Sequence, residues 1–429
     1  MKIKRAVILM TALALVAHLG AVRAQEAPHG LPTVRPEDVG FSAERLARVT
    51  AMLQANAAKN EIPGAVLLIA RHGKVAYFES VGLLDPQSKV TMRKDAIFRI
   101  YSMSKAISSV AAMMLFEDGR LILDEPVAKY LPQFENAKVA ADNRPGAPSD
   151  PEALALVPAN RPISIHDLFR HTSGLTYGFF GDTPVKKLYV KAKLLADDFT
   201  NAEFVDRLAK LPLSYQPGTV WDYGHSTDVL GRVIEVVSGK SLYAFEKERL
   251  LDPLGMSDTG FYVADKAKHA RVAEPFANDR SFGIEASFND PRVVEKWESG
   301  GGGMVSTAAD YARFLQMLLN GGTLDGKRIL SPRTVAYMTA DHLGSAVPGP
   351  YYLPGPGYGF SLAFAVRREQ GVSPVQGSVG EYNWGGAGGT AYWVDPAQDM
   401  FVVLMMQSPT QRTRYRALLR DMIYAAIEK

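Results

Sequence analysis

The tetrapeptide Ser102-Met103-Ser104-Lys105 constrains this chain more than any other stretch, because it lies where an aromatic-rich strand end runs into an apolar helix. A serine and a lysine three residues apart lie on one face of a helix, about one turn from each other. A neutral lysine amine placed there can accept or relay the serine proton, which turns the hydroxyl into a nucleophile. Ser102 and Lys105 are therefore candidate catalytic residues, and the pattern Ser-x-x-Lys occurs once in the chain.

Helix and strand patterns alternate at the N-terminal end of the chain. Ser42 is a candidate N-cap for a helix that runs to about residue 60, whose apolar residues fall on one stripe. A hairpin is predicted next, with strands over 65–70 and 75–78. The helix that follows Ser102 is expected to end near Gly119.

The middle of the chain differs from its two ends. Helical segments separated by loops rich in proline and aspartate dominate there, and strand patterns return only over 359–366, 389–394 and 400–406. A helix from about residue 410 closes the chain. We therefore expect one sheet built from both ends of the chain, with an inserted helical region and a ligand cleft between the two.

Tyr223 lies in a second candidate site segment, Trp221-Asp222-Tyr223-Gly224-His225-Ser226, just before an apolar helix. Next to a lysine ammonium its phenol would ionise more easily, because an opposite charge favours the phenolate. Tyr223 could then act as general base for the serine and later as acid for the leaving group. An ordinary loop tyrosine that packs and hydrogen-bonds is the alternative.

Two glycine-rich segments follow. Trp384-Gly385-Gly386-Ala387-Gly388-Gly389-Thr390 is predicted to open a strand, and its N–H groups could hold a developing oxyanion, although a bulge or tight turn is an equal alternative. The run of four glycines after Ser299 is followed by no Gly-Lys-[Ser/Thr], so a packing loop before a helix is the better interpretation than a phosphate cradle.

Residues 1–24 read as an export signal. A cationic start, an uncharged run of 12 residues from Ala6 to Ala17 and the small residues around Val22-Arg23-Ala24 fit that pattern. The run is shorter than the roughly 20 residues that span a bilayer, although a retained anchor is the alternative. We therefore expect an exported protein, periplasmic or secreted, cleaved near Ala24 and without a stable membrane anchor.

Charge and cysteine content exclude several classes of function. The signal contains four cationic residues (Lys2, Lys4, Arg5 and Arg23), so the rest holds 44 Lys and Arg against 45 Asp and Glu. With the charges balanced in this way, the chain has no excess of positive charge of the kind that nucleic-acid-binding proteins carry. The absence of cysteine excludes disulfides and thiolate metal sites, and no His-Glu-x-x-His occurs, so no metal is expected.

Four motifs, in this order and spacing, resemble those of the serine β-lactamase-like hydrolases, most closely the family VIII carboxylesterases, relatives of class C β-lactamases and DD-peptidases. They are Ser102-Met103-Ser104-Lys105, His171-Thr172-Ser173-Gly174-Leu175, Tyr223-Gly224-His225 and Trp384-Gly385-Gly386. The resemblance covers the chain from about Val39 to its end. It implies an α+β fold of the β-lactamase/transpeptidase type: an antiparallel sheet flanked by helices (35–119 and 291–429) plus an all-helical domain (120–290).

The resemblance also implies roles for individual residues. Ser102 matches the acyl-accepting nucleophile, Lys105 its activating partner and Tyr223 the shared acid/base. The backbone N–H groups of Ser102 and Ala387 match the oxyanion hole, and no cofactor is expected.

Two positions depart from the β-lactamase pattern. Trp384 and Gly385 stand where a lysine and a threonine hold the carboxylate of a lactam or peptide, and His225 replaces an asparagine that contacts the substrate amide. The departures favour a small uncharged ester as substrate, with His225, Trp384, Gly385 and Gly386 at its binding site. His225 could instead tune Tyr223 or act as a base itself.

Aromatic residues after the His171 segment, Tyr177, Phe179 and Phe180, could line an acyl pocket or pack in the core. The predicted activity is hydrolysis of short-to-medium acyl esters through an acyl-enzyme. A β-lactamase or D-amino acid peptidase and an acyltransferase would use the same residues, and a non-catalytic binding protein of this fold is a further alternative. The Gly-x-Ser-x-Gly motif of other esterases is absent.

Overall fold

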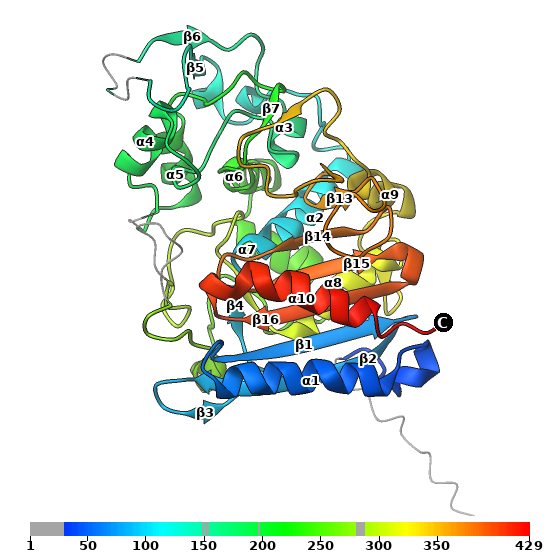
Figure 1. Cartoon of the computed structure of the whole chain (residues 1–429). Coiled ribbons are helices and arrows are strands. Elements are labelled where there is room, and N and C mark those ends of the chain that lie inside the picture. Colours follow the sequence, from blue (N-terminus) through cyan, green and yellow to red (C-terminus); the bar gives the residue numbers. More distant parts are fainter. Residues whose placement is uncertain (1–29, 148–149, 151–153, 196–197, 280–287) are drawn as a thin grey trace, which may run out of the picture. The chain divides into compact units, whose positions relative to one another are not determined.

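An eight-stranded sheet built from both ends of the chain forms the centre of the computed structural model, which describes residues 30–147, 150, 154–195, 198–279 and 288–429. The strand order is β12-β13-β14-β15-β16-β1-β2-β3, and all neighbouring pairs are antiparallel. β1, near the N-terminus, therefore lies beside β16, near the C-terminus (Figure 1). The strands are β1 (Gly64–Arg71), β2 (Lys74–Asp85), β3 (Val90–Thr91), β12 (Tyr358–Phe360), β13 (Ala365–Arg367), β14 (Tyr382–Gly385), β15 (Ala391–Asp395) and β16 (Met400–Met406).

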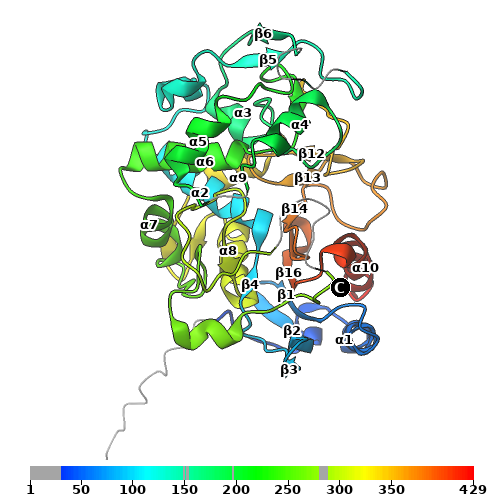
Figure 2. The same cartoon turned by 90° about the vertical axis from the view of Figure 1, so that its left-hand side faces the viewer.

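Helices cover both faces of this sheet (Figures 1 and 2). On one face, apolar residues of α1 (Ala43–Ala58) and α10 (Arg412–Tyr424) pack with Leu67 and Ile69 of β1. On the other face, Val66 and Leu68 join a core that includes α2 (Ser104–Glu117) and α8 (Ala308–Leu319). Because both faces are covered, β1 and β16 are buried at every position, which explains their unbroken apolar runs.

The predicted elements at the chain ends are largely confirmed, with two differences. Ser42 caps α1 by accepting a hydrogen bond from the N–H of Arg45. The single strand expected over 359–366 is wrong: a tight turn, in which Ser361 N donates to Phe364 O over 2.8 Å, separates β12 from β13. The segment that begins at Trp384 ends β14 and turns into β15, so it does not open a strand as expected.

Between α2 and α8, the described residues form five α-helices and members of pairs of short strands. The helices are α3 (Ile165–Phe169), α4 (Pro184–Lys191), α5 (Asn201–Leu208), α6 (Ser226–Ser238) and α7 (Leu242–Glu246). Three pairs of short strands involve this segment, and some partners lie outside it. They are β4 (Phe98–Arg99) with β8 (Val305–Ser306), β5 (Lys138–Ala140) with β6 (Leu156–Pro158), and β7 (Val220–Trp221) with β11 (Val347–Pro348). After α8 come β9 (Thr323–Leu324), β10 (Lys327–Arg328) and α9 (Pro332–Thr339).

Residues 31–429 form one compact unit, so the domain boundaries expected at residues 119 and 291 stay predictions. The expected signal segment, 1–24, lies outside the described residues. Among the residues described, none of the helices has both the length and the apolar character needed to cross a bilayer.

A buried carboxylate ties α10 to the edge of the sheet. Glu381 accepts a hydrogen bond from Arg420 of α10 over 2.7 Å and from Arg367 of β13 over 3.2 Å. Tyr358 of β12 and Asn383 of β14 bind the same carboxylate. Burial alone would raise the pKa of Glu381, but the two arginines outweigh it and hold the pKa below 4.5. The group is therefore an ion at neutral pH, fully paired inside the protein.

Replacing Glu381 by glutamine should lower the free energy of unfolding by about 3–5 kcal/mol, because it leaves two buried guanidinium groups without their counter-charge. The pKa of Glu381 is lower in the folded state, so its contribution is present above pH about 4.5 and fades as the pH falls below that. Urea unfolding at pH 7 and pH 3.5 measures both effects. Glu61→Gln, which breaks an exposed ion pair with Arg414, is the control and should cost less than about 1 kcal/mol.

Candidate active site

A strained turn presents Ser102 at the start of α2. Residues Tyr101–Met103 form a single 3-10 turn, and Tyr101 has a positive φ of 44° that bulky side chains rarely adopt. The turn is fixed on both sides, because Ile100 N donates to Met304 O over 2.9 Å and Ser104 Oγ donates to Tyr101 O over 2.6 Å. Backbone strain held by such contacts is typical of functional sites. Ser102 thus lies in the 3-10 turn before α2, whereas the sequence predicted that the Ser-x-x-Lys segment opens the helix.

The ammonium group of Lys105 is the hub of the site. Its Nζ donates to Ser102 Oγ over 3.3 Å, to Tyr177 OH over 3.0 Å and to Gly301 O over 2.5 Å. It also lies 4.7 Å from the ring centroid of Tyr223. Lys105 is 2% exposed, so these groups replace water as its partners. The lysine is therefore held within reach of the serine hydroxyl.

The glycine run after Ser299 is a packing loop that also supplies a carbonyl to Lys105. Asp228 of α6 holds this loop, because its Oδ1 accepts from Ser299 Oγ over 2.6 Å and from Gly301 N over 3.0 Å. Its Oδ2 lies 2.9 Å from His225 Nδ1. Burial would raise the pKa of Asp228, but the bonds from His225 and Ser299 and the charge of Lys105 lower it below 3.8. Asp228 thus positions Lys105 through a single residue, Gly301.

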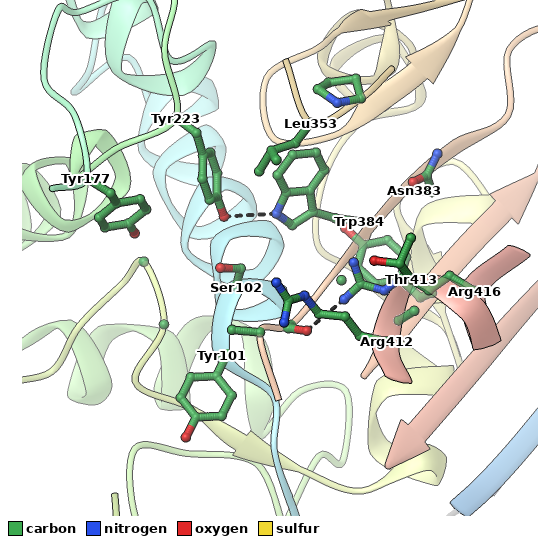
Figure 3. Close-up of a pocket in the computed structure, with 18 of the residues that line it drawn as sticks. Tyr101, Ser102, Tyr177, Tyr223, Leu353, Asn383, Trp384, Arg412, Thr413 and Arg416 are labelled. Carbon is green, nitrogen blue, oxygen red and sulfur yellow. Dashed lines mark hydrogen bonds between the residues drawn. The ribbon is translucent and has the colours of Figure 1, made fainter. Parts of the chain in front are cut away.

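Tyr223 approaches Ser102 from the loop before α6. Its hydroxyl accepts a hydrogen bond from Trp384 Nε1 over 3.1 Å, and Figure 3 shows both side chains directed at each other across the pocket from Ser102. The preceding residue, Asp222, forms a buried ion pair with Lys186 of α4 at 3.1 Å. Lys186 of α4 therefore holds the loop, and Trp384 of β14 holds the phenol oxygen of Tyr223.

The segment that begins at His171 supports the Tyr223 loop. His171 O accepts from Asp222 N over 3.0 Å, and the His171 ring packs on the Tyr223 ring at 4.9 Å between centroids. A Cβ on Gly224 would lie 2.5 Å from the carbonyl oxygen of Leu175, so the two segments are in tight contact. Burial lowers the pKa of His171 well below 6.5, and the charge of Lys105 acts in the same direction. His171 is therefore a neutral scaffold residue at physiological pH.

A second tyrosine, Tyr177, contacts Lys105 more directly than Tyr223 does. Its ring also lies 4.4 Å from that of His225 and 5.2 Å from that of Tyr223, measured between centroids. Burial raises the pKa of Tyr177 well above 10, and the negative charge of Asp228 adds to that rise. Tyr177 therefore stays protonated and is a poor general base, although its oxygen still accepts a hydrogen bond from Lys105.

The glycines of the Trp384 segment make room for groups of the protein itself. A Cβ on Gly385 would lie 2.4 Å from a terminal nitrogen of Arg416, and one on Gly386 would lie 2.3 Å from the carbonyl oxygen of Ile100. Gly386 N donates to Thr390 O over 2.9 Å, which closes the turn that carries Ala387. These contacts place the Ala387 backbone beside the same cavity as Ser102.

A cavity of about 820 Å³ opens in front of Ser102. Its walls include Tyr177, Phe179 and Phe180 on one side and Trp384 on another, so the aromatic residues expected at an acyl pocket line it. They also pack on one another: Tyr177 and Phe179 stack with centroids 4.8 Å apart. The remaining lining residues that the sequence singled out are Tyr223, His225, Gly385, Gly386 and Ala387. Within the described chain, no cluster of three His, Asp or Glu side chains could hold a metal ion.

Sequence reasoning missed three elements of this site. Asp228 had a usable signal, because it stands three residues after His225 on a predicted helix. No sequence pattern could have identified the Gly301 carbonyl or the α10 arginines, Arg412 and Arg416, since they reach the cavity only through long-range packing.

Comparison with known proteins is consistent with this geometry. A family model described as Beta-lactamase matches residues 49–425. Esterase EstB of Burkholderia gladioli is 31% identical over 410 residues, covering 90% of this chain and 96% of that protein. Lovastatin esterase of Penicillium rubens is 28% identical over 369 residues, covering 81% of this chain and 89% of its own length. The solved structure of EstCE1, a hydrolase with promiscuous acyltransferase activity, superposes with a TM-score of 0.74 at 30% identity and covers 89% of this chain and 98% of its own.

Replacing Asp228 by asparagine should slow labelling of Ser102 by a fluorophosphonate probe about 10-fold or more, because a misplaced Lys105 no longer activates the serine. The second-order rate of labelling measures this effect without a known substrate. Glu235→Gln, on the same helix but outside the cavity lining, is the matched control. Equal labelling rates in both variants, with unchanged melting temperatures, would show that Asp228 does not position Lys105.

Proposed function

This chain belongs to the beta-lactamase family and is a serine hydrolase, and from that premise we propose that it is a carboxylesterase acting on short-to-medium acyl esters. The observation that carries the proposal is the hydrogen bond between Lys105 and Ser102 at the floor of an aromatic-lined cavity. Esterases are among the relatives, as the names of EstB and lovastatin esterase state. Trp384 and Gly385 replace the lysine and threonine of the lactam-binding motif, and the loss of that motif supports an ester over a lactam.

The proposed reaction begins with attack of Ser102 Oγ on the ester carbonyl carbon. Tyr223, in its phenolate form, takes up the serine proton while the Lys105 ammonium stabilises the developing negative charge on Oγ, and the carbonyl oxygen becomes an oxyanion held by the backbone N–H groups of Ser102 and Ala387. The bond to the alcohol then breaks, the alcohol leaves with a proton from Tyr223, and Ser102 carries the acyl group. Water attacks that acyl-enzyme in the same way, which releases the acid and restores the serine.

Tyr223 is proposed as the acid/base although Tyr177 contacts Lys105. Both tyrosines line the cavity, but burial and the negative charge of Asp228 hold the pKa of Tyr177 well above 10, so Tyr177 would keep its proton through the cycle. Tyr223 faces the cavity, and the hydrogen bond from Trp384 to its oxygen stabilises a phenolate. His225 also lines the cavity and is proposed to contact the substrate, with its ring oriented by Asp228.

We also propose that the protein is exported and cleaved near Ala24. The support is the signal-like sequence of residues 1–24 alone. Intact-mass analysis of the protein recovered from its natural host would test this proposal, with a first residue at Gln25 expected. An intact N-terminus would overturn it.

The assignment of Ser102 as nucleophile predicts that Ser102→Ala lowers kcat/KM for p-nitrophenyl butyrate by at least about 10³-fold, because no nucleophile remains. Nitrocefin should be cleaved slowly or not at all by the wild type. Both substrates are measured side by side. Ser104 holds the turn and is not a suitable control, so the exposed serine variant Ser257→Ala is used instead. Dominant nitrocefin turnover would make the enzyme a β-lactamase.

The tyrosine assignment predicts different losses in two matched variants. Tyr223→Phe should lower kcat for p-nitrophenyl butyrate about 10²–10⁴-fold, because the proton-transferring hydroxyl is gone. Tyr177→Phe should lower it by less than about 10-fold, since it removes one partner of Lys105 only. The reverse order of effects would assign the acid/base role to Tyr177.

Acyl transfer is a second candidate activity. It is favoured by the likeness to EstCE1, which is a hydrolase with promiscuous acyltransferase activity. An acyl-enzyme on Ser102 can pass its acyl group to an alcohol as well as to water. Adding methanol to the butyrate assay and measuring methyl butyrate against butyric acid separates the two activities.

A further inference from the structure

Three arginines of α10 line the cavity that contains Ser102, and Arg420 is paired with Glu381, which leaves Arg412 and Arg416. Arg412 begins the helix and Arg416 follows one turn later, so the two side chains lie on the same face of α10. Figure 3 shows both extending from the helix into the pocket, on the side of Trp384 and Ser102. The reaction proposed above uses neither of them.

Neither arginine has a counter-charge among the described residues. Arg416 donates from one terminal nitrogen to Gly386 O over 2.7 Å and to Thr390 O over 2.9 Å, and Arg412 donates to Pro409 O over 2.8 Å. All three acceptors are neutral carbonyls, and in the part of the chain that the structure describes no carboxylate forms an ion pair with Arg412 or Arg416.

Two carboxylates of described residues that lie by α10 are already engaged. Asp279, near the start of the helix, accepts from Ser408 Oγ over 2.7 Å and from Thr410 Oγ1 over 3.1 Å. Glu381 pairs with Arg420, two turns after Arg412. Among the described residues, Arg412 is therefore left at the cavity wall without a carboxylate in an ion pair with it.

The two cations favour binding of a substrate that carries a negatively charged group. Burial lowers the pKa of Arg416 to about 10 and the charge of Arg412 acts in the same direction, so Arg416 is still charged at neutral pH. Like charges on one wall repel each other, and a carboxylate relieves that repulsion while matching the donor geometry of a guanidinium group.

The opposite charge lies elsewhere in the cavity. Asp198, Asp228 and Glu295 also line it, but Asp228 of α6 is bound to His225 and Ser299, and Asp198 accepts from the backbone N–H of Trp297, which stacks on Phe204 of α5. α5 and α10 lie apart in both views of the fold (Figures 1 and 2). The cavity is thus cationic at its α10 end.

We propose that Arg412, supported by the charge of Arg416, is an anion subsite that selects esters bearing a free carboxylate. The inference rests on the proposed esterase function and narrows its substrate class. It also changes the expectation from the sequence: the cationic group that is absent at Trp384 is supplied from α10, so the favoured ester is anionic and not neutral.

The test compares matched substrates in matched variants. The anionic esters are mono-p-nitrophenyl glutarate, with the carboxylate on the acyl side, and 3-butanoyloxybenzoate, with it on the alcohol side. Their neutral counterparts are p-nitrophenyl butyrate and 3-butanoyloxybenzamide. We expect the ratio of kcat/KM for an anionic ester to that for its counterpart to fall about 10- to 100-fold in Arg412→Gln, the range expected for one lost charge-assisted hydrogen bond.

Two further variants distinguish recognition by the Arg412 guanidinium group from a general effect of the positive charge of α10. Arg412→Lys keeps the charge without the planar fork and should give an intermediate ratio. Arg414→Gln removes an arginine of the same helix that pairs with Glu61 outside the cavity lining, and should leave the ratio unchanged. A ratio that is the same in Arg412→Gln and wild type for both substrate pairs, or that falls equally in Arg414→Gln, would overturn the subsite.

A binding measurement keeps this inference separate from the esterase proposal. Monomethyl glutarate and dimethyl glutarate are titrated into Ser102→Ala and Ser102→Ala/Arg412→Gln, followed by protein fluorescence. We expect the monoester to bind at least about 10-fold more tightly to the first variant and the preference to vanish in the second. Absence of that preference overturns the subsite, whereas failure of the wild type to hydrolyse any ester with the preference intact overturns only the proposed function.

Discussion

The rest of the site depends on one buried cation, the ammonium group of Lys105. Its hydrogen bonds join three segments far apart in the sequence: the turn at Ser102, the aromatic segment at Tyr177 and the glycine loop at Gly301. A charge taken out of water is costly unless it is fully paired, so these contacts hold the segments together as well as the lysine in place. Asp228 extends the network by holding the glycine loop from α6. The arrangement that we propose activates Ser102 therefore also joins distant segments of the fold around it.

Close approach of the chain to itself explains most glycines of the site. Gly386 touches the backbone just before the Ser102 turn, Gly224 touches the segment after His171, and Gly385 lies under the guanidinium of Arg416. Motifs that carry chemistry in this family thus have a second, steric reason for their composition. The same packing puts the Ala387 backbone and the Trp384 ring at the edge of one cavity.

Charge pairing on α10 divides its arginines into two groups. Arg420 meets Glu381 and Arg414 meets Glu61, and both pairs connect the helix to the body of the protein. Arg412 and Arg416 turn instead toward the cavity, where their acceptors are neutral. The helix that closes the chain thereby serves as cover for the sheet along one part of its length and as a wall of the site along another.

The sequence by itself determined the local parts of this protein. The period of the apolar residues predicted α1, and the unbroken apolar run predicted β16 over 400–406 as observed; the spacing of Ser102 and Lys105 placed them together. Local patterns failed where the chain turns on itself, as between β12 and β13 and at the end of β14. Only the tertiary structure decided which tyrosine meets Lys105 and which arginines face the serine. The contacts of Tyr177 with Lys105 and of Tyr223 with Trp384 join residues 72 and 161 positions apart, and side-chain periodicity carries no information about partners at such separations.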